Sequence, residues 1–284
     1  MIKKIATKNK NLFYKKKNNS SSKAKVKFTI ITVVLNAEKD LERTIKSVVN
    51  QSYKNYEYII VYTPSTDKTW NIILRNKKYI NKILINNKLG VYPPMNLGTN
   101  YSEGEYINFL NSGDFFYNKK TLYNVSKFVN QNYDVIYGDS VVKYDNYVKK
   151  VPVLPFNKIF YGMIFSHQSC FIKLNLQKNY QFNLKYLYSS DYDLILKLYN
   201  KKSSFFKINK PLSISKSDGI ADKNRFHTIY ENLIIVKSQN NEKYLKSFFY
   251  FIKKYFYFKI IMFLKIFLPS NLFYKIKKYK NEIL

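Results

Sequence analysis

The sequence predicts an α/β protein with a mostly parallel sheet flanked by helices, and three observations support this prediction. The chain has 284 residues, 46% of them hydrophobic, so it can bury one or two sizeable cores. Between residues 27 and 110, apolar runs rich in Ile, Val, Tyr and Phe alternate with helical patterns, which is typical of a parallel sheet covered on both faces. Polar turns follow three of the runs, and such sheets bind ligands at the carboxyl ends of their strands.

The first half of the chain predicts four strands, at 28–35, 56–62, 82–86 and 105–110. Helices are expected between them, over 37–51, from 65 to 76 and over 94–101. Ser65 is a good N-cap residue for the second helix, in which Trp70, Ile73 and Leu74 share one face.

The second half has a mixed pattern. It predicts a helix over 121–129, a strand, turn and strand over 134–144, a strand over 166–174 with Cys170 in the core, a helix over 189–199 and a short strand over 203–208. Three regions follow from these patterns: a flexible basic arm at 1–26, an α/β domain at 27–221, and a basic, aromatic-rich helical region at 222–284.

The charge balance implies an anionic partner. Lys and Arg number 49 against 18 Asp and Glu, giving a formal net charge of +31. A membrane surface, a nucleic acid or a phosphorylated substrate would suit it, although codon drift in an AT-rich genome would also enrich Lys. No nucleic-acid partner is expected, because no RNA-recognition, helix-turn-helix or zinc-finger pattern is present.

The C-terminal tail interleaves Phe and Tyr with Lys, which favours an anionic membrane surface, although the lysines do not fall on one clean helical face. A basic helix packed on the domain is the alternative. The single cysteine suits a reducing compartment, and the sequence shows neither a secretory signal nor a charge-free run long enough to span a bilayer. We therefore expect a cytoplasmic protein, peripheral on the cytoplasmic face of the plasma membrane.

Acids are scarce, so those in the turns are candidate site residues. Glu38 and Asp67 either accept hydrogen bonds from a ribose or base, or stabilise helix N-termini. Asp114 directly follows a predicted buried strand, in the turn NSGD. Asp191 and Asp193 open a helix behind two serines, and one of them could be only a partner of the helix dipole. His167, with Gln168, precedes a strand and is either structural or catalytic.

The segment from Lys27 to about Tyr199 resembles family 2 glycosyltransferases of the GT-A fold, especially bacterial enzymes of polysaccharide and lipopolysaccharide assembly. The matching text is, in order, ITVVLNAEKDLERTIKSVVNQSYKNYEYIIV, STDKT, LGVYPPMNLG, GEYINFLNSGDFFY, YGD, SHQSCF and SDYDLILKL. The resemblance implies a Rossmann-like sheet and an inverting transfer of a sugar from a nucleotide-sugar donor, with a UDP-sugar the first expectation. The acceptor would be a saccharide or a lipid-linked saccharide.

The resemblance also assigns roles to residues. It makes Asp191 the catalytic base, places His167 and Gln168 near the acceptor, and gives Asp114 a divalent metal, Mg²⁺ or Mn²⁺. The residues that would bind the nucleotide sugar are Asn36, Glu38, Tyr62, Asp67, Asn96, Asn111 and Ser112.

The sequence departs from the family pattern where Tyr62, Pro93 and Gly113 replace acids. Tyr62 could stack on a base and Lys68 could meet a phosphate, while Asn111 and Asp114 could hold Mg²⁺ weakly, mostly through waters. The metal is therefore expected to be weakly bound or dispensable. The alternative function is a catalytically degenerate, membrane-associated homologue, acting as a pseudoenzyme or scaffold in the same pathway.

Overall fold

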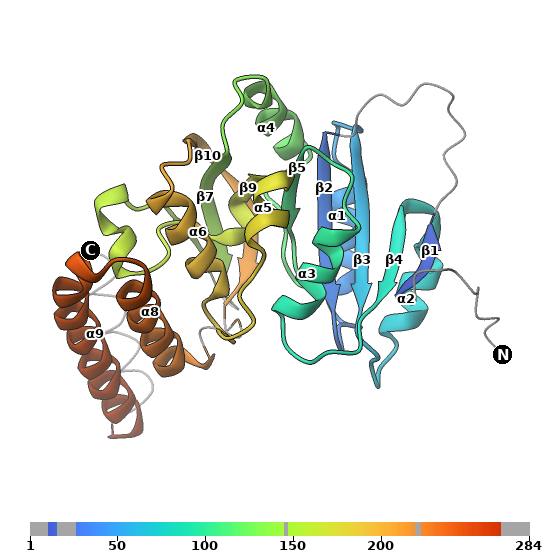
Figure 1. Ribbon diagram of the computed structural model, residues 1–284. Helices are drawn as coiled ribbons and strands as arrows, with labels where there is room; N and C mark the ends of the chain where they lie inside the picture. The colour runs from blue at the N-terminus through green and yellow to red at the C-terminus, as the bar shows by residue number, and fades with distance from the viewer. Residues whose placement is uncertain (1–10, 16–26, 145–146, 218, 220–222, 268–284) are drawn as a thin grey trace.

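The computed structural model describes residues 11–15, 27–144, 147–217, 219 and 223–267. Its strands form one sheet in the order β1-β4-β3-β2-β5-β9-β7-β10-β6, with β8 paired to β7 (Figure 1). The strands β4, β3, β2 and β5 run parallel, as predicted, and β10 is parallel to β7. The strand β9 lies antiparallel between β5 and β7 and joins the two parallel groups.

The elements have the following bounds. The strands are β1 (Leu12–Lys15), β2 (Phe28–Val34), β3 (Tyr56–Tyr62), β4 (Lys82–Ile85), β5 (Tyr106–Phe109), β6 (Phe115–Phe116), β7 (Val135–Lys143), β8 (Val148–Val151), β9 (Cys170–Lys173) and β10 (Phe205–Lys216). The helices are α1 (Leu41–Val49), α2 (Thr69–Arg75), α3 (Tyr92–Asn100), α4 (Thr121–Val129), α5 (Leu174–Tyr180), α6 (Ser190–Asn200), α8 (Arg225–Gln239) and α9 (Asn241–Phe267). Short 3₁₀ helices lie at η1 (Lys77–Tyr79), η2 (Phe156–Tyr161) and η3 (His167–Ser169).

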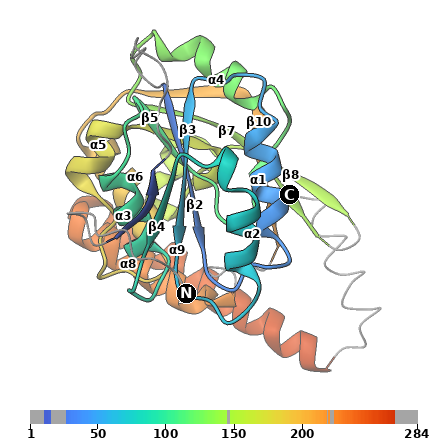
Figure 2. The ribbon, with the colours of Figure 1, turned by 90° about the vertical axis from the view of Figure 1, so that its right-hand side faces the viewer.

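Helices cover both faces of the sheet, because successive strand residues point to opposite sides. In β2, Ile30 packs into the core under α1, α2 and α4, whereas Ile31 packs into the core under α3 and α6. Figure 2 shows α1 and α2 on one side of the sheet and α3, α5 and α6 on the other. Cys170 is buried in the second of these cores, as predicted.

The structure corrects the predicted start of the second helix. The helix α2 begins at Thr69, so Ser65 is not its N-cap. The Ser65 hydroxyl instead donates to the Thr63 carbonyl at 2.9 Å, and the Asp67 carboxylate accepts the Thr69 N–H at 2.9 Å. Leu74 is exposed and Ile72 takes its place on the buried face.

Three other predictions differ from the structure. The predicted strand, turn and strand over 134–144 is one strand, β7, which pairs antiparallel with β8. The strand predicted over 203–208 continues to Lys216, because β10 pairs with β7 along its whole length. Within the arm expected to be flexible, Leu12–Lys15 forms β1, an edge strand antiparallel to β4.

The C-terminal region is helical where the structure describes it. The helix α8 packs on α6, and α9 lies along α8 at the end of the molecule opposite β1 (Figure 1). Among the described residues, no helix combines the length and apolarity needed to cross a membrane.

Candidate active site

The turns after β2 and β3 are clamped to each other by side chains. Asn36, which has a positive φ of 49°, accepts the Thr66 N–H on Oδ1 at 2.9 Å. The Glu38 carboxylate accepts the Lys68 N–H at 3.0 Å, and in return the Glu38 N–H donates to Asp67 Oδ2 at 3.0 Å. The two turns therefore form one rigid rim at the carboxyl end of the sheet.

Asp67 uses both carboxylate oxygens in this clamp. Partial desolvation acts to raise its pKa, but hydrogen bonds from Thr69 and from the N–H of Glu38 outweigh it and lower the pKa. Tyr62 also serves the clamp: its hydroxyl accepts the Ser65 N–H at 3.0 Å, and its ring packs on Trp70 at 4.8 Å between centroids.

The turn NSGD lies where β5 ends and contacts α1. Gly113 has a φ of +97°, and its N–H donates to the Thr44 hydroxyl at 3.0 Å. The same hydroxyl donates to the Asp114 carbonyl at 2.8 Å, so one threonine holds the turn. Among the described atoms, neither Asn111 Oδ1 nor the Ser112 hydroxyl, both buried, has a hydrogen-bond partner.

The carboxylate of Asp114 is buried at the end of this turn. Gln168 donates to it through Nε2 at 2.9 Å. Asp114, predicted to bind the metal, therefore contacts Gln168, predicted to lie near the acceptor. Burial raises the pKa of Asp114 to about 6, although Gln168 and the nearby His167 act to lower it. At pH 7 the group is therefore mostly ionised, and below about pH 6 it carries a proton.

The two acids that open α6 have different surroundings. Asp193 is buried and accepts Gln239 Nε2 at 2.6 Å, so it joins α6 to α8. Asp191 faces the pocket, where the Tyr92 hydroxyl donates to Oδ1 at 3.1 Å. Burial and the Asp191 charge keep the pKa of Tyr92 well above its usual value, so Tyr92 stays a hydrogen-bond donor. Of the two candidates, Asp191 alone lines the pocket.

His167 connects the turn NSGD to Asp191. Its Nδ1 lies 3.4 Å from Asp191 Oδ2 and its Nε2 lies 3.4 Å from Asn111 Nδ2. With the Asn111 amide donating, a neutral imidazole carries its proton on Nδ1, facing Asp191. Burial acts to lower the pKa of His167, but the carboxylates of Asp191 and Asp114 outweigh it and raise the pKa.

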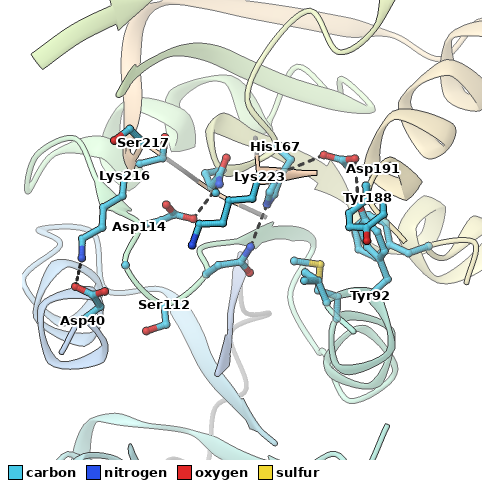
Figure 3. A pocket seen from close by; sticks show the side chains of 18 of the residues that line it. Asp40, Tyr92, Ser112, Asp114, His167, Tyr188, Asp191, Lys216, Ser217 and Lys223 are labelled. Atoms are coloured by element: carbon cyan, nitrogen blue, oxygen red, sulfur yellow. Dashed lines mark hydrogen bonds and ion pairs between the residues drawn. The ribbon is translucent and has the colours of Figure 1, made fainter. Parts of the chain in front are cut away.

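These groups line one pocket with a volume of about 560 Å³. Figure 3 shows Lys216 reaching Asp40 on one side of it, Tyr92 and Asp191 on the other, and Asp114 between them. Its lining residues are Asp40, Val91, Tyr92, Met95, Asn111, Ser112, Gly113, Asp114, His167, Gln168, Phe182, Leu187, Tyr188, Asp191, Ser215, Lys216, Ser217, Gly219 and Lys223.

The structure places some predicted residues outside this pocket. Asn36, Glu38, Tyr62 and Asp67 belong to the clamped rim, and Lys68 lies there with them. Asn96 lies behind the wall: its side-chain amide bonds both the carbonyl and the N–H of Phe182, at 2.8 and 2.9 Å. Asn96 therefore positions Phe182, which lines the pocket.

Seven polar lining residues were not among the predicted site residues, and four of them have a clear part in the site. Asp40 and Lys216 form an ion pair across the pocket mouth, Tyr92 holds Asp191, and Lys223 adds a second cation. Asp40 and Tyr92 lie inside the motif blocks that match the family, so their place in those blocks could have identified them as site residues. Lys216 and Lys223 were two lysines among many, and only the fold distinguishes them.

The donor atoms near NSGD fit a divalent cation only in part. Among the described residues, no group of three or more His, Cys, Asp and Glu side chains could hold a metal ion. The side-chain oxygens near the turn are the Asp114 carboxylate, the unpaired Asn111 Oδ1 and Ser112 hydroxyl, and the Asp40 carboxylate, which is already paired with Lys216. They suit Mg²⁺ or Mn²⁺ in kind but not in number. Such a set would leave most coordination positions to ligand and water oxygens.

Comparison with known proteins identifies the class. The model of the family "Glycosyl transferase family 2" matches residues 29–195, and the chain belongs to this family. The protein is therefore a glycosyltransferase of the GT-A fold, as the sequence predicted. A curated relative, "PGL/p-HBAD biosynthesis glycosyltransferase" of Mycobacterium tuberculosis, is 26% identical over 179 residues, covering 61% of this chain and 70% of the relative.

Three solved structures, of two proteins, are similar in fold. Staphylococcus aureus TarS matches with a TM-score of 0.62 and 18% identity, covering 78% of this chain and 43% of that one. This chain thus spans less than half of that TarS chain. A shorter TarS, solved with UDP-GlcNAc, matches with a TM-score of 0.61 and 19% identity, covering 75% and 67%. The mannosyltransferase PcManGT of Pyrobaculum calidifontis, solved with GDP-Man and Mn²⁺, matches with a TM-score of 0.59 and 15% identity, covering 75% and 63%.

Proposed function

We propose that the protein transfers a sugar from a nucleotide sugar, with inversion, to a saccharide or lipid-linked acceptor in cell-surface polysaccharide assembly. One observation carries the proposal: Asp191, oriented by Tyr92 and His167, faces the turn NSGD across a single pocket. A base on one side of a reacting sugar and a site for the leaving group on the other are what a single displacement needs.

The reaction assigns each group a role. The acceptor hydroxyl gives its proton to the Asp191 carboxylate while its oxygen forms a bond to the anomeric carbon. The bond from that carbon to the diphosphate oxygen breaks, and the nucleoside diphosphate leaves with the electron pair. Because attack and departure occur on opposite faces, the configuration at the anomeric carbon inverts. His167 lies beside the base, and Gln168, the next residue, donates to Asp114; both are assigned to the acceptor side.

The nucleoside is assigned to the clamped rim of Asn36, Glu38, Tyr62 and Asp67, and the diphosphate to Asn111 and Ser112. The unpaired Ser112 hydroxyl can donate to a phosphate oxygen, whereas the unpaired Asn111 Oδ1 only accepts and suits a sugar hydroxyl or a cation that comes with the diphosphate. UDP-sugars are the first expectation for the donor, in keeping with the similarity to TarS, which was solved with UDP-GlcNAc. PcManGT, solved with GDP-Man, makes GDP-sugars the second choice.

The leaving diphosphate needs positive charge. A divalent cation held weakly by Asp114 would supply part of it when bound, as the similarity to PcManGT with Mn²⁺ suggests. Lys216 and Lys223 line the same pocket and would supply the rest as point charges. The proposed metal dependence is therefore weak.

A further part of the proposal is peripheral attachment to the cytoplasmic face of the plasma membrane, through the region from about Tyr244 onward. This region interleaves aromatic residues with Lys, and each Lys near an anionic surface contributes about 1 kcal/mol. A lipid-linked acceptor would be presented at the same membrane surface, so the proposed attachment and the proposed acceptor are consistent with each other.

The test is a panel of nucleotide sugars, measured for binding and for transfer or hydrolysis with and without Mg²⁺ or Mn²⁺. One donor that binds and turns over, with loss of turnover in Asp191→Asn, is expected. Donor binding without turnover on any acceptor fraction of the cell surface would favour the non-catalytic homologue. Absence of binding to every nucleotide and nucleotide sugar would overturn the proposal.

A further inference from the structure

The helix α9 carries an apolar stripe on the side that faces away from the protein. The stripe consists of Leu245, Phe249, Ile252, Phe256, Ile260, Phe263 and Phe267, and we call it the α9 stripe. Apart from Ile252, at 37%, these residues are 58–65% exposed. Their spacing of three and four residues places all seven on one face of the helix over a length of about 33 Å.

The opposite side of α9 is the packed side. Phe251 is 1% exposed and belongs to the same core as Ile31 and Cys170, and Ser247 is fully buried. Arg225 of α8 lies over the Phe258 ring at 4.4 Å, and the rings of Tyr161 and Tyr250 lie 4.6 Å apart. These contacts fix the rotation of the helix about its axis, so the exposure of the stripe is a consequence of packing and not of a loose helix. Figure 1 shows α9 as the outermost element at this end of the molecule.

Lysines flank the stripe on both sides. Lys246 and Lys253 are exposed along one edge, and Lys259 is exposed along the other. The whole helix carries Lys at positions 243, 246, 253, 254, 259 and 265 and one acid, Glu242. An apolar face bordered by cations is the pattern of a helix that lies in the plane of an anionic membrane surface, with the amines at headgroup level.

We infer that the α9 stripe is the surface by which this protein docks on an anionic lipid bilayer, with α9 lying parallel to the membrane plane. This inference deepens the proposed membrane attachment by naming one face of one helix. In the sequence alone, the lysines of α9 do not fall on one face. In the structure, the packing of α9 partly buries Lys254, and Lys246, Lys253 and Lys259 remain exposed beside the stripe.

A second copy of the chain is the rival occupant, since a three-and-four spacing also suits a coiled coil. The charges argue against it. Of the residues that flank the seam, Lys246, Lys253 and Lys259 would find no acid to pair with across an interface between two α9 helices except Glu242, the single acid of the helix. Four of the seven seam positions are Phe, where two-stranded coiled coils prefer Leu, Ile and Val. An anionic surface satisfies the same lysines without a partner acid.

The experiment measures co-sedimentation of the full chain with vesicles of phosphatidylcholine mixed with phosphatidylglycerol, and with vesicles of phosphatidylcholine alone. The stripe variant is Phe249→Gln, Phe256→Gln and Phe263→Gln together. The matched control is Leu89→Gln, Val148→Gln and Leu154→Gln, which replaces three exposed apolar residues elsewhere on the surface. A third variant, Lys246→Glu with Lys253→Glu, removes the flanking charge and leaves the stripe.

Wild type and control are expected to bind the anionic vesicles equally, and the stripe variant at least about tenfold more weakly. The lysine variant should lose binding by a similar factor at low salt, with a smaller difference at high salt. Circular dichroism and the unfolding midpoint of each variant show whether the fold is kept. Equal pelleting of the stripe variant and wild type would overturn the inference.

Sedimentation velocity without lipid tests the rival occupant. A wild-type dimer that the stripe variant converts to monomer, together with unchanged vesicle binding, would assign the stripe to self-association and overturn the inference. UDP binding, measured on the same samples, is an independent readout of the donor site. A chain that docks on vesicles but binds no nucleotide would refute the proposed transferase site and leave the docking surface standing.

Discussion

The imidazole of His167 lies with Nδ1 3.4 Å from Oδ2 of Asp191, and both side chains line the same pocket. His167 comes from a 3₁₀ turn before β9, and Asp191 opens α6. Asn111, on the other ring nitrogen, extends the contact to the turn after β5. The proposed donor side and the proposed base are therefore joined by one side chain, so changes at His167 and Asp191 are expected to be coupled.

The first prediction concerns the base. Asp191→Asn should lower turnover about 10²- to 10⁴-fold with little loss of donor binding, because the amide keeps the shape but accepts no proton. Steady-state kinetics and nucleotide binding to the same preparation measure the two effects. The matched control is Asp193→Asn, two residues away on α6 but bonded to Gln239 and not in the pocket. If His167→Ala abolishes transfer while Asp191→Asn does not, His167 is the base.

The second prediction concerns pH and stability. The carboxylates beside His167 raise its folded pKa above the unfolded value of about 6.5. A raised pKa stabilises the fold below the unfolded pKa, and this contribution is lost as the pH rises through the folded pKa. Asp114, with a pKa raised to about 6, makes the same kind of change at lower pH, between about 4 and 6. The window between about pH 6.5 and 8 therefore reports mainly on the histidine, since the buried Cys170 thiol, whose pKa is also raised, acts only above it.

In that window, urea unfolding of the wild type should show a falling free energy with rising pH, and His167→Gln should flatten the slope. His227→Gln is the control, since it removes the other histidine of the chain, which lies on α8 beside the Tyr188 ring. A wild-type slope that survives in His167→Gln, or that disappears in His227→Gln, contradicts the assignment.

The third prediction concerns Gly113. Its φ of +97° is unfavourable for any L side chain, so Gly113→Ala should lower the free energy of unfolding by about 1 kcal/mol or more. Gly113→Asp, which restores the acid of the family pattern, should lower the free energy of unfolding more than Gly113→Ala does. A Cβ at this position would lie 3.7 Å from Asp40 Oδ2, so two carboxylates would meet.

Chemical unfolding of the two Gly113 variants, alone and with Asp40→Asn, separates strain from charge repulsion. Removing the Asp40 charge should rescue part of the loss in Gly113→Asp and none of the loss in Gly113→Ala. The prediction fails if Gly113→Asp is as stable as wild type and binds Mn²⁺ tightly.

The fourth prediction concerns the metal and the lysines. Nucleotide binding should survive chelation in part, because Lys216 and Lys223 share the charge of the diphosphate. Lys216→Gln with Lys223→Gln should weaken UDP binding and increase its dependence on added Mg²⁺. Any contribution of the metal should also fade below about pH 6, where the buried carboxyl of Asp114 takes up a proton.

Asp114→Ala is the decisive variant for that prediction. Isothermal titration with Mn²⁺, with and without UDP, should show weak binding in the wild type and weaker binding still in Asp114→Ala. Tight stoichiometric Mn²⁺ binding that Asp114→Ala leaves intact would mean that the metal is held elsewhere in the chain. Lys127→Gln, which changes an exposed lysine on α4, controls for the general loss of positive charge.

The sequence by itself determined the parallel half of the sheet and the family. Strands β2, β3, β4 and β5 were readable because their residues are apolar runs of the right length between helical patterns, a local property. The family resemblance was also readable from the sequence, because each of the matching motif blocks is a contiguous stretch of residues. Asp191 and Asp193 were placed correctly at the opening of a helix. The residues alone left their roles open, and only the family resemblance named Asp191 as the base.

Tertiary structure decided what depends on groups distant in the chain. It assigned Asp193 to Gln239 and Asp191 to the pocket, moved the start of α2 from Ser65 to Thr69, and brought Lys216 and Lys223 to the turn NSGD. It also decided which side of α9 is free. A helical pattern with Phe and Lys on several faces has no unique inner side until neighbouring elements bury one of them, and here Phe251 and Ser247 are the residues that α9 buries.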